Sequence, residues 1–205
     1  SDFSVQIAGE VSDFDPLVWV PKKEARHMDR FIHFAIAAAQ LAFDDAGLSA
    51  PLSNPERCGA LIGVGLGGLE SLELAAKTLA ERGPRRLSPF MIPQLIANLA
   101  PGQVSMRLGL QGPNLSSVSA CATGAHSLGD AARLIAWGEA DVMVAGGAEA
   151  TITPLGVGGF AAVQLCALPK HRADAPRLRT VGVFWGFTFG VVLAVDGRPG
   201  FGLHA

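Results

Sequence analysis

The sequence contains no tyrosine, only three cysteines and few charged residues. Its 205 residues carry 16 lysines and arginines against 18 aspartates and glutamates, a formal net charge of −2. This balance gives no support to nucleic-acid binding. Three cysteines without close pairing do not suggest a disulfide framework, and a reducing compartment is the simpler expectation. No spacing of histidines and cysteines matches a zinc site, so we expect no metal.

Membrane-like segments are also scarce. The first residues, SDFSVQIAGEVSDF, lack the basic-then-apolar order of a signal peptide. The one membrane-like run, VGVFWGFTFGVVLAV at residues 181–195, falls short of the roughly 20 residues that a spanning helix needs. Three glycines weaken it further as a helix. We therefore expect a buried strand or hairpin there and no membrane segment.

Apolar residues and glycine are abundant, at 49% and 25 copies. This composition is typical of a well-buried α/β protein. The spacing of apolar residues predicts helices over 26–48, 69–83 and 123–137, and strands over 57–65, 114–119 and 140–147. Strand, helix and strand joined by short connections favour a parallel sheet.

Prolines interrupt a helical pattern over residues 89–108. Pro93 fits the first turn of a helix, where proline is tolerated, whereas Pro101 is expected to kink or end one. After Phe160 the character changes, because VQLCALPKHRADAPRLRT is basic and contains proline. That segment is typical of a loop.

Cys121 stands where a serine-rich strand meets a helix, in SSVSACATGAHSLGDAARL. Only the thiolate attacks, and a free thiol is only about 3% ionised at neutral pH. The N-terminus of the following helix favours an anion by about 0.3–1 kcal/mol, which activates a thiol only in part. A catalytic Cys121 therefore needs a basic partner, whereas a small packed cysteine needs none. Cys58 and Cys166 are expected to be inert.

A glycine motif, GVGLGG at residues 63–68, satisfies G-x-G-x-x-G between a strand and a helix. The dinucleotide fingerprint also needs a second strand that ends in an acidic residue about 20 positions on. That region reads ERGPRRLSPF, which is not a strand. A tight turn or a wall of a substrate pocket is favoured over a nucleotide site.

Histidines and lysines supply the remaining candidates. His126 follows the cysteine by five residues, which rotates its side chain about 140° around a helix and away from the thiol. His33 lies in an apolar helix and is expected to be a packed or surface histidine. Lys22, Lys23 and Arg26 stand in PKKEARHMDR, which is either a solvated face or a docking site for an acidic partner.

Three motifs carry a resemblance to a known family: SACATGAHSLGDAARLIAWGEADVMVAGGAEATITPLGVGGFAA, RRLSPFMIPQLIANLAPGQVSMRLGLQGPN and IGVGLGGLE. They closely resemble the β-ketoacyl-acyl carrier protein synthases, most of all the type II elongating enzymes. The resemblance covers about residues 2–162. It implies a thiolase-like α/β fold with α-β-α-β-α layers, here mainly its N-terminal half without the first strand.

The resemblance also implies a reaction, the decarboxylating Claisen condensation of fatty acid synthesis. An acyl group moves from acyl carrier protein onto a cysteine, and the carbanion formed from malonyl-acyl carrier protein then attacks the thioester. By this match Cys121 is the nucleophile, and its backbone N–H forms part of the oxyanion hole. Leu66 matches a gate of the acyl pocket, while Met91 and Phe160 match positions that line it. No cofactor is implied.

Partners follow from the same resemblance. Lys22, Lys23 and Arg26 fall where the family uses positive charge to meet acidic acyl carrier protein. The strand before Cys121 lies at a two-fold homodimer interface in such enzymes, with Met91 near it. The parent protein would be cytoplasmic or in the plastid stroma.

The chain departs from the family chiefly in length. Such enzymes are roughly twice as long, and their two catalytic histidines, a lysine and an oxyanion-hole phenylalanine lie in a later half that these residues do not contain. We divide the chain into 1–162, a partial N-terminal domain, and 163–205, a divergent segment of it in which Phe187 replaces an acid. This portion alone is expected to be inactive, and the missing central strand to leave an open sheet edge.

Two alternatives remain open at this point. One is a non-catalytic partner subunit that resembles a chain-length factor, although such partners usually lack the cysteine found at position 121. The other is a nucleotide-binding reductase, for which the only support is Gly63, Gly65 and Gly68.

Overall fold

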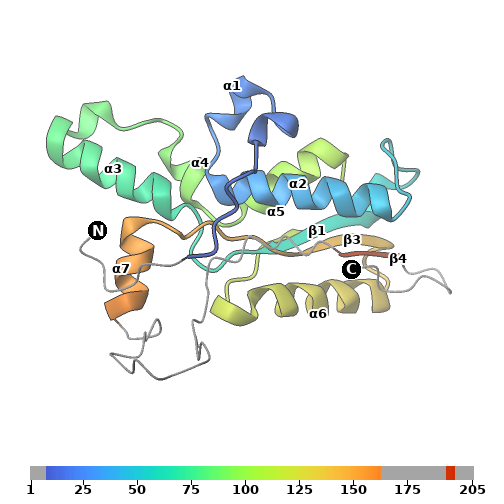
Figure 1. Ribbon diagram of the computed structural model, residues 1–205. Coiled ribbons are helices and arrows are strands. Elements are labelled where there is room, and N and C mark those ends of the chain that lie inside the picture. Colours follow the sequence, from blue (N-terminus) through green and yellow to red (C-terminus); the bar gives the residue numbers. More distant parts are fainter. Residues whose placement is uncertain (1–7, 163–192, 197–205) are drawn as a thin grey trace.

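A four-stranded sheet between two layers of helices forms the centre of the computed structural model, which describes residues 8–162 and 193–196 (Figure 1). The strands are β1 (Cys58–Gly63), β2 (Asn114–Leu115), β3 (Val142–Gly147) and β4 (Leu193–Asp196). Their order is β2-β1-β3-β4. β1 is parallel to β2 and β3, and β4 is antiparallel to β3. The predicted α/β class and the parallel pairing are confirmed.

Helices cover both faces of this sheet (Figure 1). α2 (Arg30–Asp45) and α5 (Leu99–Leu108) lie on one face, and α6 (Thr123–Ala136) lies on the other. The remaining helices are α1 (Lys22–Ala25), α3 (Leu69–Arg82), α4 (Met91–Leu95) and α7 (Pro154–Ala162). In chain order α3 follows the carboxyl end of β1 and α7 follows that of β3, so both continue from the same end of the sheet.

The core divides at the sheet, because alternate residues of a strand face opposite sides. Ala60, Ile62 and Val144 belong to the cluster that includes α2 and α5. Leu61 and Met143 belong to a second cluster, together with residues of α6. All six residues of β1 are buried. This strand is covered on both faces, which is typical of parallel sheets.

The three predicted helices are confirmed as α2, α3 and α6, with ends that differ by a few residues. Gly47 and Gly83 follow α2 and α3 with φ of 67° and 77°, which glycine adopts without strain. His33 is packed inside α2, as expected, and its Nε2 lies 3.1 Å from the Ala25 carbonyl oxygen. Burial lowers the pKa of His33.

Three expectations were wrong. The strand predicted over 114–119 ends at Leu115 as β2, and beyond it Ser117 Oγ and the Ser119 N–H bind residues of α6, although the Ser117 carbonyl oxygen still accepts from Val64. Pro101 neither kinks nor ends a helix, since it is the third residue of α5, where no intrahelical N–H is needed. The expected open edge does not lie between β1 and β3, because these two strands of the described sheet pair directly over six residues.

Some expectations lie outside the described residues. These are Cys166, Phe187 and most of the run 181–195, of which only the last three residues are described, as part of β4. Among the helices that the structure describes, none is long and apolar enough to cross a membrane.

Candidate functional site

Cys121 lies in a tight turn directly before α6. It is the middle residue of a 3-10 turn, Ala120–Ala122. Ala120 has a φ of 51°, in the left-handed region that non-glycine residues rarely adopt. The Cys121 side chain is exposed, and within residues 8–162 its backbone N–H donates no hydrogen bond. The turn therefore presents a thiol and a backbone donor together.

Hydroxyl groups hold this turn against α6. Ser117 Oγ lies 2.7 Å from Ser127 Oγ, across the start of the helix. The backbone N–H of Ser119 donates to Thr123 Oγ1 at 2.8 Å. The Ser119 hydroxyl lies 2.7 Å from His126 Nδ1. The Ser117 carbonyl oxygen also accepts a hydrogen bond from the Val64 N–H at 3.1 Å, so the serine-rich run is bound both to the end of β1 and to the start of α6.

The histidine and the second described cysteine do not supply the missing base. His126 Nδ1 is bound to the hydroxyl of Ser119, just before the turn, and the expectation that this ring does not point at the thiol stays a prediction. Cys58 is buried in β1, and its Sγ donates to the Asn54 carbonyl oxygen at 3.1 Å. A buried thiol of this kind is expected to be inert.

The glycine loop, residues 63–68, packs closely against other residues of this chain, namely Glu149 and Gln94. A methyl group at Gly65 would lie 2.6 Å from Glu149 Oε2, and one at Gly68 would lie 2.1 Å from the Gln94 carbonyl oxygen. Gly67 has a φ of 83°. A carboxylate therefore lies where a dinucleotide pyrophosphate would approach the loop, and its charge would repel one. The motif is a tight turn, as the sequence favoured, and the structure argues against the nucleotide-binding alternative.

Glu149 is a buried acid that the sequence analysis did not single out. Its residue surface is only 9% exposed, and Oε2 accepts a hydrogen bond from the Leu66 backbone at 2.6 Å. Burial raises the pKa of Glu149, while hydrogen bonds from backbone N–H groups oppose that rise. The available signal was a single acid soon after an apolar strand, in ADVMVAGGAEA. Which loop it binds cannot be read from the sequence.

The expected pocket residues occupy neighbouring elements. Leu66 is 56% exposed at the tip of the glycine loop, Met91 begins α4, and Phe160 lies partly buried in α7. The loop contacts α4, because the backbone N–H of Gly68 donates to the Leu95 carbonyl oxygen at 3.2 Å. The structure thus brings together the segments that carry Leu66 and Met91. Their role in binding an acyl chain stays a prediction, as does that of Phe160.

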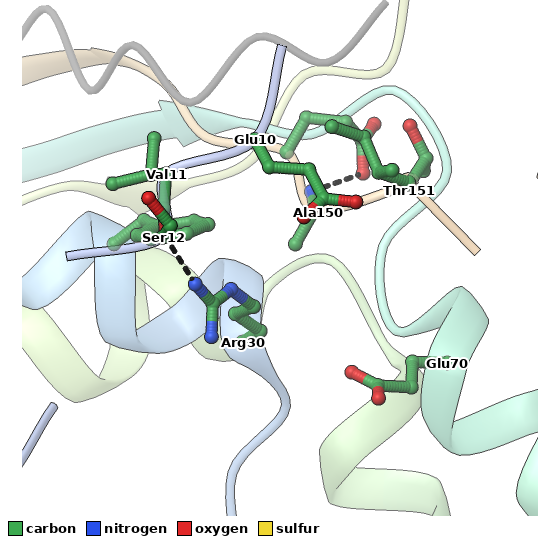
Figure 2. A pocket seen from close by; sticks show the side chains of 10 residues that line it. Glu10, Val11, Ser12, Arg30, Glu70, Ala150 and Thr151 are labelled. Carbon is green, nitrogen blue, oxygen red and sulfur yellow. Dashed lines mark hydrogen bonds between the residues drawn. The ribbon is translucent and has the colours of Figure 1, made fainter. Parts of the chain in front are cut away.

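Glu149 also lines a cavity of about 260 Å³, which Figure 2 shows from close by. Glu10, Arg30 and Glu70 line it, and the Arg30 guanidinium donates to the Val11 carbonyl oxygen at 2.7 Å. None of the residues expected at the acyl site lines this cavity. Within the described part of the chain, no cluster of three or more His, Cys, Asp or Glu side chains could hold a metal ion.

The basic residues of α1 form an exposed face. Lys22, Lys23 and Arg26 are all exposed. The acid on the same helix, Glu24, is paired with Arg107 at 2.5 Å. Because Glu24 is bound elsewhere, it does not neutralise the lysines beside it.

Comparisons with known sequences agree with one another. The family model described as Beta-ketoacyl synthase, N-terminal domain, matches residues 2–194, and so continues past residue 162. The 3-oxoacyl-[acyl-carrier-protein] synthase 2 of Vibrio harveyi is 48% identical over 177 residues, which is 86% of this chain and 42% of that protein. The Staphylococcus aureus protein of the same name is 48% identical over 160 residues, which is 78% of this chain and 40% of that protein.

Solved structures give the same result. A beta-ketoacyl synthase from Burkholderia phymatum matches with a TM-score of 0.71 and 29% identity, over 82% of this chain and 41% of that one. A type II PKS acyl-carrier protein in complex with its ketosynthase matches with a TM-score of 0.70 and 25% identity, over 76% and 45%. The chain spans about two fifths of the length of the curated relatives that it matches.

Proposed function

This chain belongs to the β-ketoacyl synthase family, whose N-terminal domain model matches residues 2–194, and on that premise we propose that it is the nucleophile-bearing part of a condensing enzyme of fatty acid synthesis. The observation that carries the proposal is the Cys121 turn. An exposed thiol and an uncommitted backbone N–H stand together at the start of α6. This pairing suits acyl transfer, which needs a nucleophile and an oxyanion donor at one carbon atom.

The reaction proceeds in two stages. Cys121 Sγ attacks the carbonyl carbon of an acyl thioester on acyl carrier protein, and the carrier thiol leaves with the proton. Malonyl-acyl carrier protein then loses carbon dioxide, and its carbanion attacks the acyl carbon as the bond to Cys121 breaks. The product is a β-ketoacyl-acyl carrier protein. The Cys121 N–H and the positive end of α6 stabilise the developing negative charge.

Acyl loading tests this function. The chain is incubated with iodoacetamide, or with an acyl-acyl carrier protein in a full-length synthase that carries this chain as its N-terminal part. Peptide mass mapping is expected to find Cys121 modified first in both cases. Modification of Cys58 or Cys166 ahead of Cys121 would move the nucleophile elsewhere. Full-length protein that loads no acyl group at all would remove the condensing function.

The chain-length preference is expected to depend on Leu66. In the full-length synthase, Leu66→Phe should lower kcat/KM for long acyl chains relative to short ones by about tenfold, because the larger ring narrows the pocket. The measurement is a series of acyl-acyl carrier protein substrates of increasing length. Leu74→Phe is the matched control, since Leu74 is 65% exposed on α3, outside the loop. An unchanged profile would remove Leu66 from the pocket.

Acyl carrier protein is the partner that we propose for the basic face of α1. This face adjoins α4, because Gln94 Nε2 donates to the Arg26 carbonyl oxygen at 3.2 Å and the His27 ring stacks on Phe90 at 3.6 Å. A carrier protein bound at Lys22 and Lys23 would therefore lie beside the helix that begins with Met91. That position suits delivery of an acyl chain to the expected pocket.

Charge reversal tests this docking face. In the full-length synthase, Lys22→Glu with Lys23→Glu should raise the apparent KM for acyl carrier protein about tenfold at low salt, mostly through slower association. The effect should shrink as ionic strength rises. Lys77→Glu, on the exposed face of α3, is the control. Equal KM values for the double variant and the control would leave α1 as an ordinary solvated helix.

A homodimer and a reducing compartment complete the proposal. β2 is the edge strand of the described sheet, and Leu115 and Val118 are exposed along that edge. An exposed apolar edge of this kind suits pairing with a second copy.

A nucleophilic thiol must stay reduced, which suits the cytoplasm or plastid stroma.

A further inference from the structure

The glycine loop is built around a single buried carboxylate. Glu149 Oε2 accepts from the Leu66 backbone N–H at 2.6 Å and Oε1 from that of Ala150 at 3.3 Å, and the amides of Gly65 and Gly67 on either side of Leu66 help to oppose the rise in the pKa of this side chain. Three successive N–H groups of one loop therefore converge on one acid. Such a concave run of amides is an anion-binding nest. Here the anion comes from the chain itself, two residues beyond β3.

Gly65 is the residue that makes this approach possible. A Cβ atom there would meet Glu149 Oε2 at 2.6 Å, and among the described residues beyond its chain neighbours it would meet no atom outside Glu149 within 4 Å. On the opposite side the loop touches backbone, since Gly68 lies against the Gln94 carbonyl and donates to that of Leu95. The loop is thus held between α4 and Glu149. The contact with α4 is made by backbone atoms, whereas the contact with Glu149 is made by a side chain and can be removed by substitution.

No cation shares the charge of Glu149. It takes part in none of the ion pairs formed by residues 8–162. The charged groups that line the cavity beside it are Glu10, Glu70 and Arg30, and the Arg30 guanidinium is bound to the Val11 carbonyl oxygen and packed over Phe34. Backbone amides, first that of Leu66 at 2.6 Å and then that of Ala150 at 3.3 Å, are therefore the stabilising partners of this carboxylate among the described residues.

We infer that Glu149 is a positioning residue, which fixes the place of Leu66 and thereby the acyl chain length that the site accepts. The inference rests on the proposed function, in which Leu66 gates the acyl pocket. Removing the carboxylate releases the three amides around Leu66 without touching Leu66 itself. The Leu66 side chain, which gates the acyl pocket in the proposed function, then moves together with the released backbone.

Two measurements separate the positioning role from the proposed function. Hydrogen exchange of residues 65–67 needs no activity, and in Glu149→Ala these amides should exchange at least tenfold faster. In the full-length synthase the same variant should lose length discrimination, with the ratio of kcat/KM for long and short acyl chains changing at least threefold. Glu149→Gln keeps one acceptor oxygen and should restore part of both. Glu73→Ala is the control, since it removes an acid–amide bond to Leu155 outside the loop.

A double-mutant cycle tests the same contact through stability. Gly65→Ala should destabilise the wild type, because its methyl group displaces the Glu149 carboxylate. In a Glu149→Ala background it should lower the urea midpoint no further, since the methyl group then meets nothing. Gly68→Ala should stay costly in both backgrounds, because it meets the backbone of Gln94.

The outcomes are distinct. Additive effects of Gly65→Ala and Glu149→Ala, or unchanged exchange at residues 65–67, would overturn the anchoring role. Faster exchange with an unchanged chain-length profile would overturn the role in specificity. A full-length protein that performs no condensation would instead sink the proposed function, and the exchange and stability results would still decide whether Glu149 holds the loop.

Discussion

Replacing Cys121 by serine is expected to lower the condensation rate of a full-length synthase that carries this chain by at least about a thousandfold. A serine hydroxyl is far less acidic than a thiol, and the N-terminus of a helix stabilises an anion by only about 1 kcal/mol. The α6 helix therefore cannot make the hydroxyl a comparable nucleophile. Steady-state assay of β-ketoacyl product measures the loss. Binding of acyl carrier protein should remain near that of the wild type.

Cys58→Ser is the matched control for this substitution. The Cys58 side chain is buried and donates to the Asn54 carbonyl oxygen, a bond that a serine hydroxyl also makes. Condensation by this variant should stay within about threefold of the wild type, since surface and core changes away from the reacting atoms act mainly on stability. A Cys121→Ser enzyme that kept a tenth of the activity, or a Cys58→Ser enzyme that lost it, would show that the nucleophile was misassigned.

The second large effect is expected at Gly63, the last residue of β1. Gly63→Ala should destabilise the chain by about 3 kcal/mol or more, the upper range for overpacking a core. Its methyl group would lie 2.1 Å from Thr123 Cγ2 and 2.7 Å from the hydroxyl oxygens of Ser117 and Ser127. Those two hydroxyls bind each other, and the Thr123 side chain is held by the Ser119 N–H, so none of these groups can withdraw without loss of a hydrogen bond. Urea unfolding, followed by circular dichroism, measures the change.

Gly129→Ala provides the control within α6. A methyl group at Gly129 would meet no atom within 4 Å, so the substitution should stabilise the helix by up to about 1 kcal/mol. Gly63→Ala should also slow iodoacetamide labelling of Cys121, because it displaces the start of the helix that the turn leads into. Equal stability of the two variants would mean that β1 and α6 do not meet as closely as described.

Local sequence determined most of the secondary structure and the position that we propose as the nucleophile. α2, α3 and α6 follow from the spacing of their apolar residues, and β1 and β3 from short apolar runs. The same local information located Cys121 at the junction of a strand region and a helix. Helix ends were also predictable, because Gly47 and Gly83 are residues that adopt positive φ without strain. These features depend on residues a few positions apart.

The tertiary structure decided the contacts between residues that are distant in sequence. The hydroxyl of Ser117 and the N–H of Ser119 bind α6, beyond the point where β2 ends earlier than its composition suggests. The group that the glycine loop binds is Glu149, which lies 83 residues beyond Leu66 in the chain. Glycines let another group come close to the backbone, and they do so equally for a carboxylate of the protein and for a bound nucleotide. The sequence by itself therefore determined that something comes near this loop, and only the fold decided that it is a side chain of the protein.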